Sequence, residues 1–218
     1  MRRWVEPDRR QDVAETFAAE LALAGKLPPG DSLLHAWLPQ PTLLFTQRDT
    51  RAPGFDAATA AATGMGYAPV VRVSGGEAVP LDIGTACVDL LLPGEALPLR
   101  AAFDALAQAL VAAVAELGLT ATVGRVEGAY CPGDYDIAVG GLKFAGLAQR
   151  RTQQAIAVHS FVLVQGPGRP RCLDAARIAA TLQQVEAPAN PACPVTSLAA
   201  AAGRLIRPEE FLQAVRLP

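Results

Sequence analysis

The sequence lacks an excess of charge of either sign. Its 218 residues carry 19 basic and 21 acidic side chains, which give a formal net charge of −2. Proteins that bind nucleic acid through its phosphates usually show a basic excess or a basic patch. We therefore expect no nucleic-acid partner.

Long apolar runs are also missing. No segment approaches the roughly 18 consecutive apolar residues that a membrane-spanning helix requires. The first residues, Met1–Pro7, lack the apolar stretch of a secretory signal peptide. We expect a cytoplasmic protein with no membrane partner. Since 51% of the residues are hydrophobic, the composition excludes a disordered chain.

Cysteine is scarce and widely spaced, and it occurs at Cys87, Cys131, Cys172 and Cys193. No pair has Cys-x-x-Cys spacing, so we predict no zinc site and no other metal or cofactor. Disulfides are uncommon in a reducing compartment. Each cysteine is therefore expected to be either a small buried residue or a nucleophile.

Lysine and histidine are rarer still. Lys26 and Lys143 stand against 17 arginines, and the two histidines are His35 and His159. A lysine kept in such a background can serve through its compact ammonium or its adjustable pKa, although a chance lysine on a surface turn is the simpler alternative. His159 lies in an apolar segment with no acidic residue near it in the sequence, so we leave it out of the catalytic set.

The pattern of apolar residues predicts an α+β fold. The clearest helix spans 99–117, where apolar residues recur every three or four positions, and Gly140-Gly141 predicts a hairpin turn. Further helices are expected at 12–24, 56–63, 171–184 and 208–215. Strands are expected at 32–38, 42–47, 67–73, 86–92, 120–126, 136–139, 142–148 and 154–164. Runs of strands between helices favour a mixed or antiparallel sheet flanked by helices, in one domain over residues 1–218.

Three segments could carry chemistry. Ser74-Gly75-Gly76 follows a β-branched strand, and its backbone N–H groups could bind a phosphate or an acyl oxyanion. Cys131 lies in a turn rich in Gly, Pro and Asp, where a thiol can be exposed and reactive. Lys143 follows the hairpin, near small residues that leave room for a ligand. An ordinary tight turn, a structural thiol and close strand packing are the respective alternatives.

Together these segments resemble the lipoate/biotin protein ligase and octanoyltransferase family. The family's Arg-x-Ser-Gly-Gly-x-Ala-Val signature and its following Asp are matched by Arg72, Ser74, Gly75, Gly76, Ala78, Val79 and Asp82. Residues Gly141–Gln149 resemble its Gly-x-Lys-hydrophobic-x-Gly-x-Ala-Gln segment, and Val195–Leu198 resembles its Val-Thr-Ser-Leu. Three segments in the same order are far more specific than any one of them.

This resemblance implies a class II biotin/lipoyl synthetase-like fold. Within the family, a cysteine twelve residues before the lysine is similar to the cysteine-dependent lipoyl-amidotransferase branch. The branch implies that Cys131 carries an octanoyl or lipoyl group as a thioester and that Lys143 assists it. Implied partners are an octanoyl-carrier protein (glycine cleavage H protein or acyl carrier protein) and lipoyl domains. The implied substrate-binding residues are Arg72, Ser74, Gly75, Gly76, Ala78, Val79, Asp82 and Gly146.

We expect Lys143 to lower the pKa of the Cys131 thiol or to bind the acyl carbonyl, and Val71, Val73 and Phe144 to wall an acyl tunnel. One alternative function is an ATP-dependent lipoate or biotin ligase, although Glu77 and Leu81 depart from the ligase pattern. Another is a non-catalytic module that binds an acyl carrier. A second candidate nucleophile is Cys193, which precedes the Val-Thr-Ser-Leu segment as in the carrier-dependent octanoyltransferases.

Overall fold

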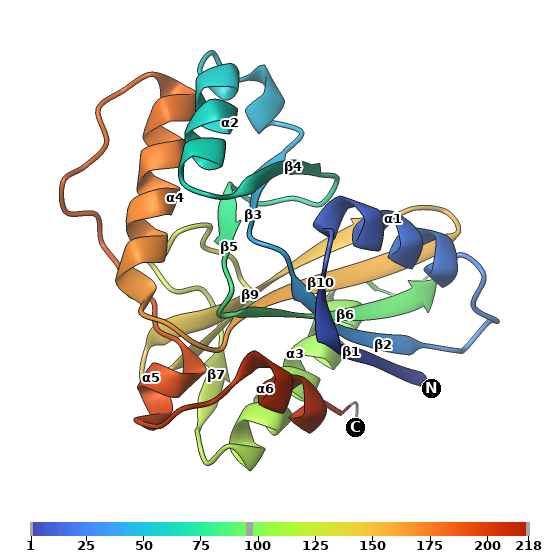
Figure 1. Cartoon of the computed structure of the whole chain (residues 1–218). Coiled ribbons are helices and arrows are strands. Elements are labelled where there is room, and N and C mark those ends of the chain that lie inside the picture. Colours follow the sequence, from blue (N-terminus) through green and yellow to red (C-terminus); the bar gives the residue numbers. More distant parts are fainter. Residues whose placement is uncertain (1, 95–97, 217–218) are drawn as a thin grey trace.

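A seven-stranded mixed sheet forms the frame of the molecule (Figure 1). The structure, a computed structural model, describes residues 2–94 and 98–216. In spatial order the strands are β1 (Arg2–Gln11), β2 (Leu33–Pro39), β6 (Thr85–Pro93), β10 (Ala155–Leu163), β9 (Leu142–Arg151), β8 (Asp136–Val139) and β7 (Ala121–Val123). β1 and β2 pair in parallel, and the other neighbouring pairs are antiparallel.

A second sheet of three strands lies beside the first. Its central strand β3 (Thr42–Thr46) pairs in parallel with β4 (Ala68–Arg72) and antiparallel with β5 (Val79–Leu81). Residues 73–78 connect β4 to β5 and contain the Ser-Gly-Gly segment. The glycine-rich loop therefore joins two strands of the small sheet rather than a strand to a helix.

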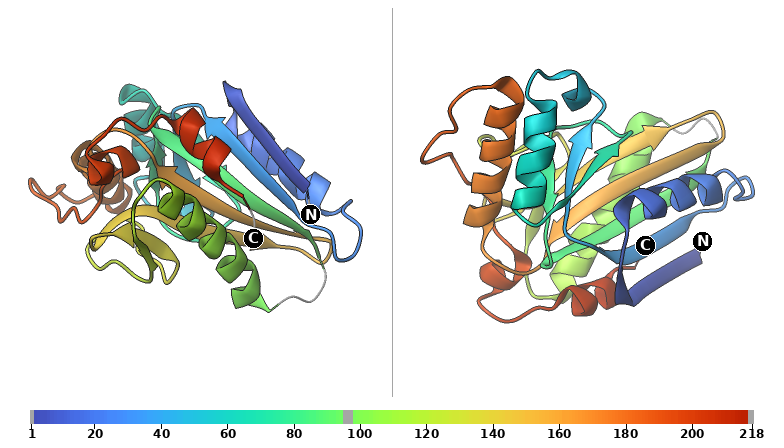
Figure 2. Two further views of the ribbon diagram at one scale, coloured as in Figure 1. Left: turned by 90° about the horizontal axis from the view of Figure 1, so that it is seen from below. Right: turned by 45° about the horizontal axis from the view of Figure 1, so that its top comes forward.

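Helices cover both faces of the large sheet (Figures 1 and 2). In Figure 1, α3 and α6 lie below this sheet and α1 lies above it, while α2 and α4 pack against the small sheet. Their bounds are α1 (Val13–Ala24), α2 (Phe55–Gly64), α3 (Leu99–Glu116), α4 (Gly168–Gln183), α5 (Leu198–Ala202) and α6 (Pro208–Ala214). A short 3-10 helix, η1, spans Asp49–Arg51.

The main core lies between α3 and the large sheet. Leu106, Leu110 and Val114 follow one face of α3 and are fully buried against strand residues such as Val88 and Ile137. This helix lacks charged residues in its buried stripe, so its stability comes from packing rather than from ion pairs. In the part of the chain that the structure describes, no helix is both long and apolar enough to cross a membrane.

The observed architecture confirms the predicted α+β class. The helix expected at 99–117 is α3, and the one expected at 12–24 is α1, which begins after Asp12 because the Asp12 side chain accepts a hydrogen bond from the N–H of Glu15. β1 was not predicted, since its charged residues show no apolar alternation. β5 and α5 were too short to leave a periodic signal.

The expectation that no cysteine forms a disulfide is wrong. Cys172 at the start of α4 is bonded to Cys193, with an S–S distance of 2.06 Å. The reason lies in the fold: α4 packs closely on the segment that leads to Val195, and a Cβ on Gly168 would lie 2.2 Å from the Val195 carbonyl oxygen. Sequence spacing alone does not show this approach.

Candidate active site

A cavity of about 390 Å³ lies where the glycine-rich loop, the Cys131 turn and β9 meet. β10 and the start of α3 complete its walls. Its apolar lining consists of Val79, Leu81, Leu99, Phe103, Phe144, Leu147, Phe161 and Leu163. The volume falls in the range of roughly 300–1,000 Å³ that is usual for small-molecule sites, and the lining suits an aliphatic ligand.

The structure brings most of the predicted site residues to this cavity. Gly75 and Gly76 of the glycine-rich loop and Lys143 of β9 all line this cavity. This confirms the prediction that the two segments share one cleft. The predicted residues that line the cavity are Arg72, Gly75, Gly76, Val79, Cys131, Lys143 and Gly146.

Cys131 is partly exposed and is held in an unusual backbone conformation. Its φ angle is 46°, in the left-handed region that a non-glycine residue adopts at a cost of roughly 1–3 kcal/mol. Its thiol accepts a hydrogen bond from the Glu77 N–H at 3.2 Å, and its own N–H donates to the Glu77 carboxylate at 3.2 Å. The glycine-rich loop and the cysteine turn are thus joined at the thiol.

Arg72 is the cation beside this thiol. Its Nη2 lies 4.0 Å from Cys131 Sγ and donates to the Glu77 carbonyl oxygen at 2.9 Å. Burial lowers the pKa of Arg72, yet an arginine remains protonated in proteins. Gly76 makes the arrangement possible, because a Cβ there would lie 2.6 Å from Arg72 Nη2 and 2.9 Å from Cys131 Sγ.

The contacts of Lys143 differ from those expected. Its Nζ donates to the carbonyl oxygens of Tyr130 at 3.2 Å and Cys131 at 2.7 Å, and pairs with Asp136 Oδ1 at 2.7 Å. An ammonium has three protons, and these three acceptors use all of them. The ammonium therefore holds the main chain of the cysteine turn, and Arg72 takes the place beside the thiol that we had assigned to Lys143.

Asp136 is a site residue that the sequence reasoning missed. Besides its pair with Lys143, its Oδ2 accepts hydrogen bonds from the N–H groups of Val126 at 3.2 Å and Gly133 at 3.1 Å. It lies at the start of β8, five residues after the cysteine, and this proximity to the turn was the available signal. Gly146 leaves room for the Lys143–Asp136 ion pair, since a Cβ there would lie 3.2 Å from Lys143 Nζ.

Three predicted substrate-binding residues do not line the cavity. Asp82 binds Arg171 Nη2 at 2.7 Å and the Gly84 N–H at 2.9 Å, so it fastens the turn between β5 and β6 to α4. Ala78 faces a separate pocket beside α4. Ser74 is buried just before the glycines, but its side chain does not reach the cavity wall.

Of the three residues predicted to wall an acyl tunnel, one lines the cavity. Phe144 lines the cavity. Val71 and Val73 are wrong, because 38% and 50% of their surfaces are exposed and neither belongs to the lining. Leu99 and Phe103 of α3 supply the apolar wall instead. They were hidden from sequence reasoning because a helix remote from the motifs contributes them.

Of the other cysteines, none offers a free accessible thiol. Cys193 forms a disulfide with Cys172 and so has no free thiol. Cys87 lies inside β6 and is fully buried, and burial raises the pKa of its thiol well above the usual value. Cys131 is therefore the free, partly exposed cysteine of this chain.

The fold is that of lipoate protein ligases. A candidate lipoate protein ligase from T. acidophilum, solved with bound lipoic acid, has a TM-score of 0.63 at 20% identity, and the match covers 78% of this chain and 70% of that one. Residues 12–217 match the family described as the lipoyl protein ligase A/B catalytic domain, so the chain belongs to that family.

Relatives with higher identity are octanoyltransferases. The octanoyl-GcvH:protein N-octanoyltransferase of Geobacillus kaustophilus is 34% identical over 164 residues, which cover 73% of this chain. Its namesake in Exiguobacterium sibiricum is 32% identical over 158 residues, or 72% of this chain. In both cases the match spans only 58% of the relative's own length.

Proposed function

We propose that this chain transfers an octanoyl or lipoyl group, through a thioester on Cys131, from a carrier protein to a lysine of a lipoyl domain. The observation that carries the proposal is the free Cys131 thiol at the wall of an apolar cavity, beside Arg72. The names of the relatives, which describe octanoyl transfer and GcvH, agree with it. Since the chain spans little more than half of those relatives, the donor and the acceptor are proposed together with the activity.

Binding of the acyl chain would rest on the apolar wall. Each methylene that leaves water contributes about 0.8 kcal/mol. Phe103, Phe144 and Phe161 offer aromatic surface for an aliphatic tail, and Arg72, Asp136 and Lys143 line the same cavity as Cys131. The lining thus combines an apolar surface for the tail with polar groups around the nucleophile.

In the first step the thiolate of Cys131 attacks the acyl carbonyl carbon. A C–S bond forms, the carbonyl oxygen becomes an oxyanion, and collapse of this intermediate breaks the bond to the carrier. The leaving group is a lysine nitrogen, which takes up a proton, if the carrier holds the acyl group as an amide, and a thiolate if it holds it as a thioester. The Arg72 guanidinium and the Glu77 N–H both lie beside the attacking sulfur. We assign the oxyanion to backbone N–H groups of Gly75 and Gly76, where one such donor is typically worth about 3 kcal/mol of barrier.

In the second step the amine of the acceptor lysine attacks the acyl-enzyme. A C–N bond forms, the C–S bond breaks, the nitrogen loses a proton, and the thiolate is restored. Neither step consumes ATP, because the acyl group arrives already activated or already amide-bound. Glu77 fits this scheme, since its carboxylate accepts the Cys131 N–H and would repel the phosphate of an acyl-adenylate.

In this mechanism Lys143 is a positioning residue. Its hydrogen bonds to two carbonyl oxygens of the turn hold Cys131 in the left-handed conformation. This conformation turns the Cys131 N–H toward Glu77, and the thiol toward the Glu77 N–H.

The deciding experiment is intact-mass analysis after mixing the protein with an octanoylated carrier protein. We expect a gain of one octanoyl unit that disappears in Cys131→Ala and persists in Cys193→Ala under reducing conditions. Adding an apo lipoyl domain should then discharge the acyl group onto the domain.

Two results would overturn the proposal. Acylation that occurs only with ATP, Mg²⁺ and free octanoic or lipoic acid, and that survives Cys131→Ala, would identify a ligase. Carrier binding without any acyl-cysteine would identify a binding module.

A further inference from the structure

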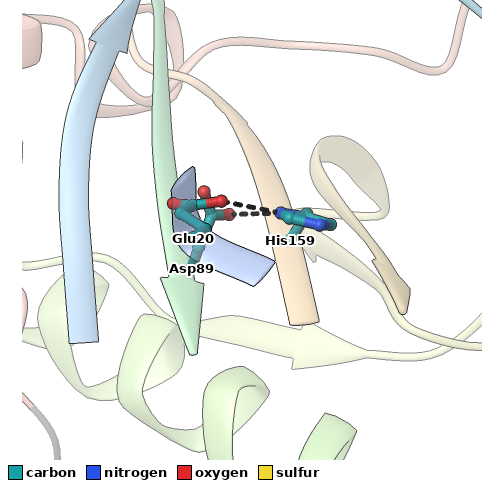
Figure 3. A group of neighbouring side chains, drawn as sticks. All are labelled: Glu20, Asp89 and His159. Atoms are coloured by element: carbon teal, nitrogen blue, oxygen red, sulfur yellow. Dashed lines mark ion pairs between the residues drawn. The ribbon is translucent and has the colours of Figure 1, made fainter. Parts of the chain in front are cut away.

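A second group of polar side chains lies buried between α1 and the large sheet (Figure 3). His159 of β10 and Asp89 of β6 are direct cross-strand neighbours, so their side chains leave the sheet on the same face. Glu20 reaches them from α1, and Figure 3 shows all three side chains pointing toward one another. One ligand atom from each lies within 4.8 Å of the other two.

His159 Nδ1 and Glu20 Oε2 make ion-pair contacts that are longer than ordinary hydrogen bonds. His159 Nδ1 is 3.5 Å from Glu20 Oε2 and 3.5 Å from Asp89 Oδ1. Within the described residues, neither His159 Nδ1 nor Glu20 Oε2 has a hydrogen-bond partner, although Glu20 is 1% exposed and His159 is 3% exposed. Leaving such atoms without a hydrogen bond in the interior is costly, and a cation between them would satisfy both.

The same carboxylates are held by further hydrogen bonds, one of which reaches Asp89 Oδ1, the oxygen that faces His159. His35 Nδ1 lies 2.6 Å from Glu20 Oε1, Trp37 Nε1 donates to Asp89 Oδ2 at 2.7 Å, and the Ser160 N–H donates to Asp89 Oδ1 at 3.0 Å. These contacts fix each carboxylate in one orientation. Metal ligands are held in this way by a surrounding set of hydrogen bonds.

We propose that Glu20, Asp89 and His159 bind a divalent transition-metal ion of the zinc class, which fastens α1 to β6 and β10. Two atoms that each lie about 2.1 Å from a tetrahedral zinc ion are about 3.4 Å apart, close to the two observed separations of 3.5 Å. One imidazole and two carboxylates form a borderline donor set that suits zinc and its neighbours better than calcium.

The site is structural rather than catalytic, because all three ligands are buried away from the cavity lining. It nevertheless adjoins the cavity. Phe17, one turn before Glu20 on α1, has its ring centroid 4.3 Å from that of His159 and 6.4 Å from that of Phe161. Phe161 lines the cavity, so fastening α1 also fixes this wall.

A shared proton is the competing occupant. Burial, followed by the charge of Asp89, raises the pKa of Glu20 well above its usual value, which favours its protonated form when no cation is bound. Glu20→Gln separates the two possibilities. Glutamine copies the shape of a neutral glutamic acid and keeps its oxygen, but it is a poor metal ligand.

The test measures zinc binding and thermal unfolding of the full chain, after treatment with a chelator, in the wild type and in a Cys131→Ser background that removes the free accessible thiol. We expect one zinc ion per chain and a zinc-dependent rise in Tm in both. Glu20→Gln, Asp89→Asn and His159→Gln should weaken binding by about 100-fold or more, and Trp37→Phe by about tenfold. Glu15→Gln, the same change at an exposed position of α1, should bind as the wild type does.

The proposal is overturned if the wild type takes up no stoichiometric zinc, or if Glu20→Gln keeps both the zinc and the rise in Tm. Cobalt checks the ligand set independently, since cysteine thiolate ligands give Co²⁺ an intense near-ultraviolet band that carboxylate and imidazole do not. Such a band in the wild type that vanishes in Cys131→Ser would place the metal at the cysteine and also reject the proposal. If Asp89→Asn or His159→Gln fails to fold, Glu20→Gln still decides.

Discussion

Two buried groups of charged side chains, one at the cysteine turn and one between α1 and the large sheet, differ in how completely they are hydrogen-bonded. At the cysteine turn, each proton of the Lys143 ammonium has an acceptor, and both oxygens of Asp136 have donors. Between α1 and the sheet, Glu20 Oε2 and His159 Nδ1 face each other at 3.5 Å without a hydrogen bond. A fully hydrogen-bonded group can act as a scaffold, whereas buried polar atoms without hydrogen bonds call for an explanation such as a bound ion.

Removing Asp136 should have the largest effect. Asp136→Ala leaves a buried ammonium without its counter-charge and two N–H groups of the turn without an acceptor, so we expect the free energy of unfolding to fall by about 3–5 kcal/mol. Urea unfolding measures it. Asp134→Ala, at an exposed position two residues earlier, is the control and should stay near the wild type. A small effect of Asp136→Ala would mean that the cysteine turn does not depend on this pair.

Lys143→Arg should reduce acyl transfer by about 100-fold, because a guanidinium is larger and cannot place its protons as one compact ammonium does. The ammonium already lies 3.2 Å from the position of a Cβ on Gly146, so the larger group has little room. Single-turnover transfer from an octanoylated carrier measures it, with the exposed Lys26→Arg as the control. Near-normal transfer would show that the turn is held without Lys143.

Gly76→Ala should slow acylation of Cys131 by about tenfold, since at φ 111° the new methyl group would push against Arg72 Nη2 and the thiol. Gly75→Ala is the matched control, because nothing lies within 4 Å of a Cβ there. Alkylation rates of Cys131 in the two variants measure the difference. Equal rates would indicate that the glycine-rich loop shifts freely.

Asp82→Asn should have the smallest effect. Its partner Arg171 also donates to the carbonyl oxygens of Gln165, Gly166 and Pro167, and the Asp82 side chain is 30% exposed. We expect a loss of about 1 kcal/mol or less in stability and unchanged transfer. A large fall in transfer with normal stability would return Asp82 to the substrate-binding residues that its family motif implies.

The same comparison shows what the sequence could and could not reveal. Cys131 and Lys143 lie in segments whose local pattern resembles a known family, so their meeting at one cavity could be predicted. His159 was set aside because no acidic residue lies near it in the sequence. Its acidic neighbours, Glu20 and Asp89, are more than 60 residues away along the chain, and only the β6–β10 register and the packing of α1 bring them together.

β1, which no periodic pattern in the sequence predicted, is an edge strand of the large sheet. An edge strand offers unpaired backbone groups to any other strand and can start aggregation. This strand contains Pro7, which has no N–H to donate, and two adjacent arginines, Arg9 and Arg10. Its register with β2 is also broken between Glu6 and Arg10. These features make the edge a poor template for a second chain. The residues that hid the strand from prediction should also keep concentrated solutions of the protein free of edge-to-edge polymers.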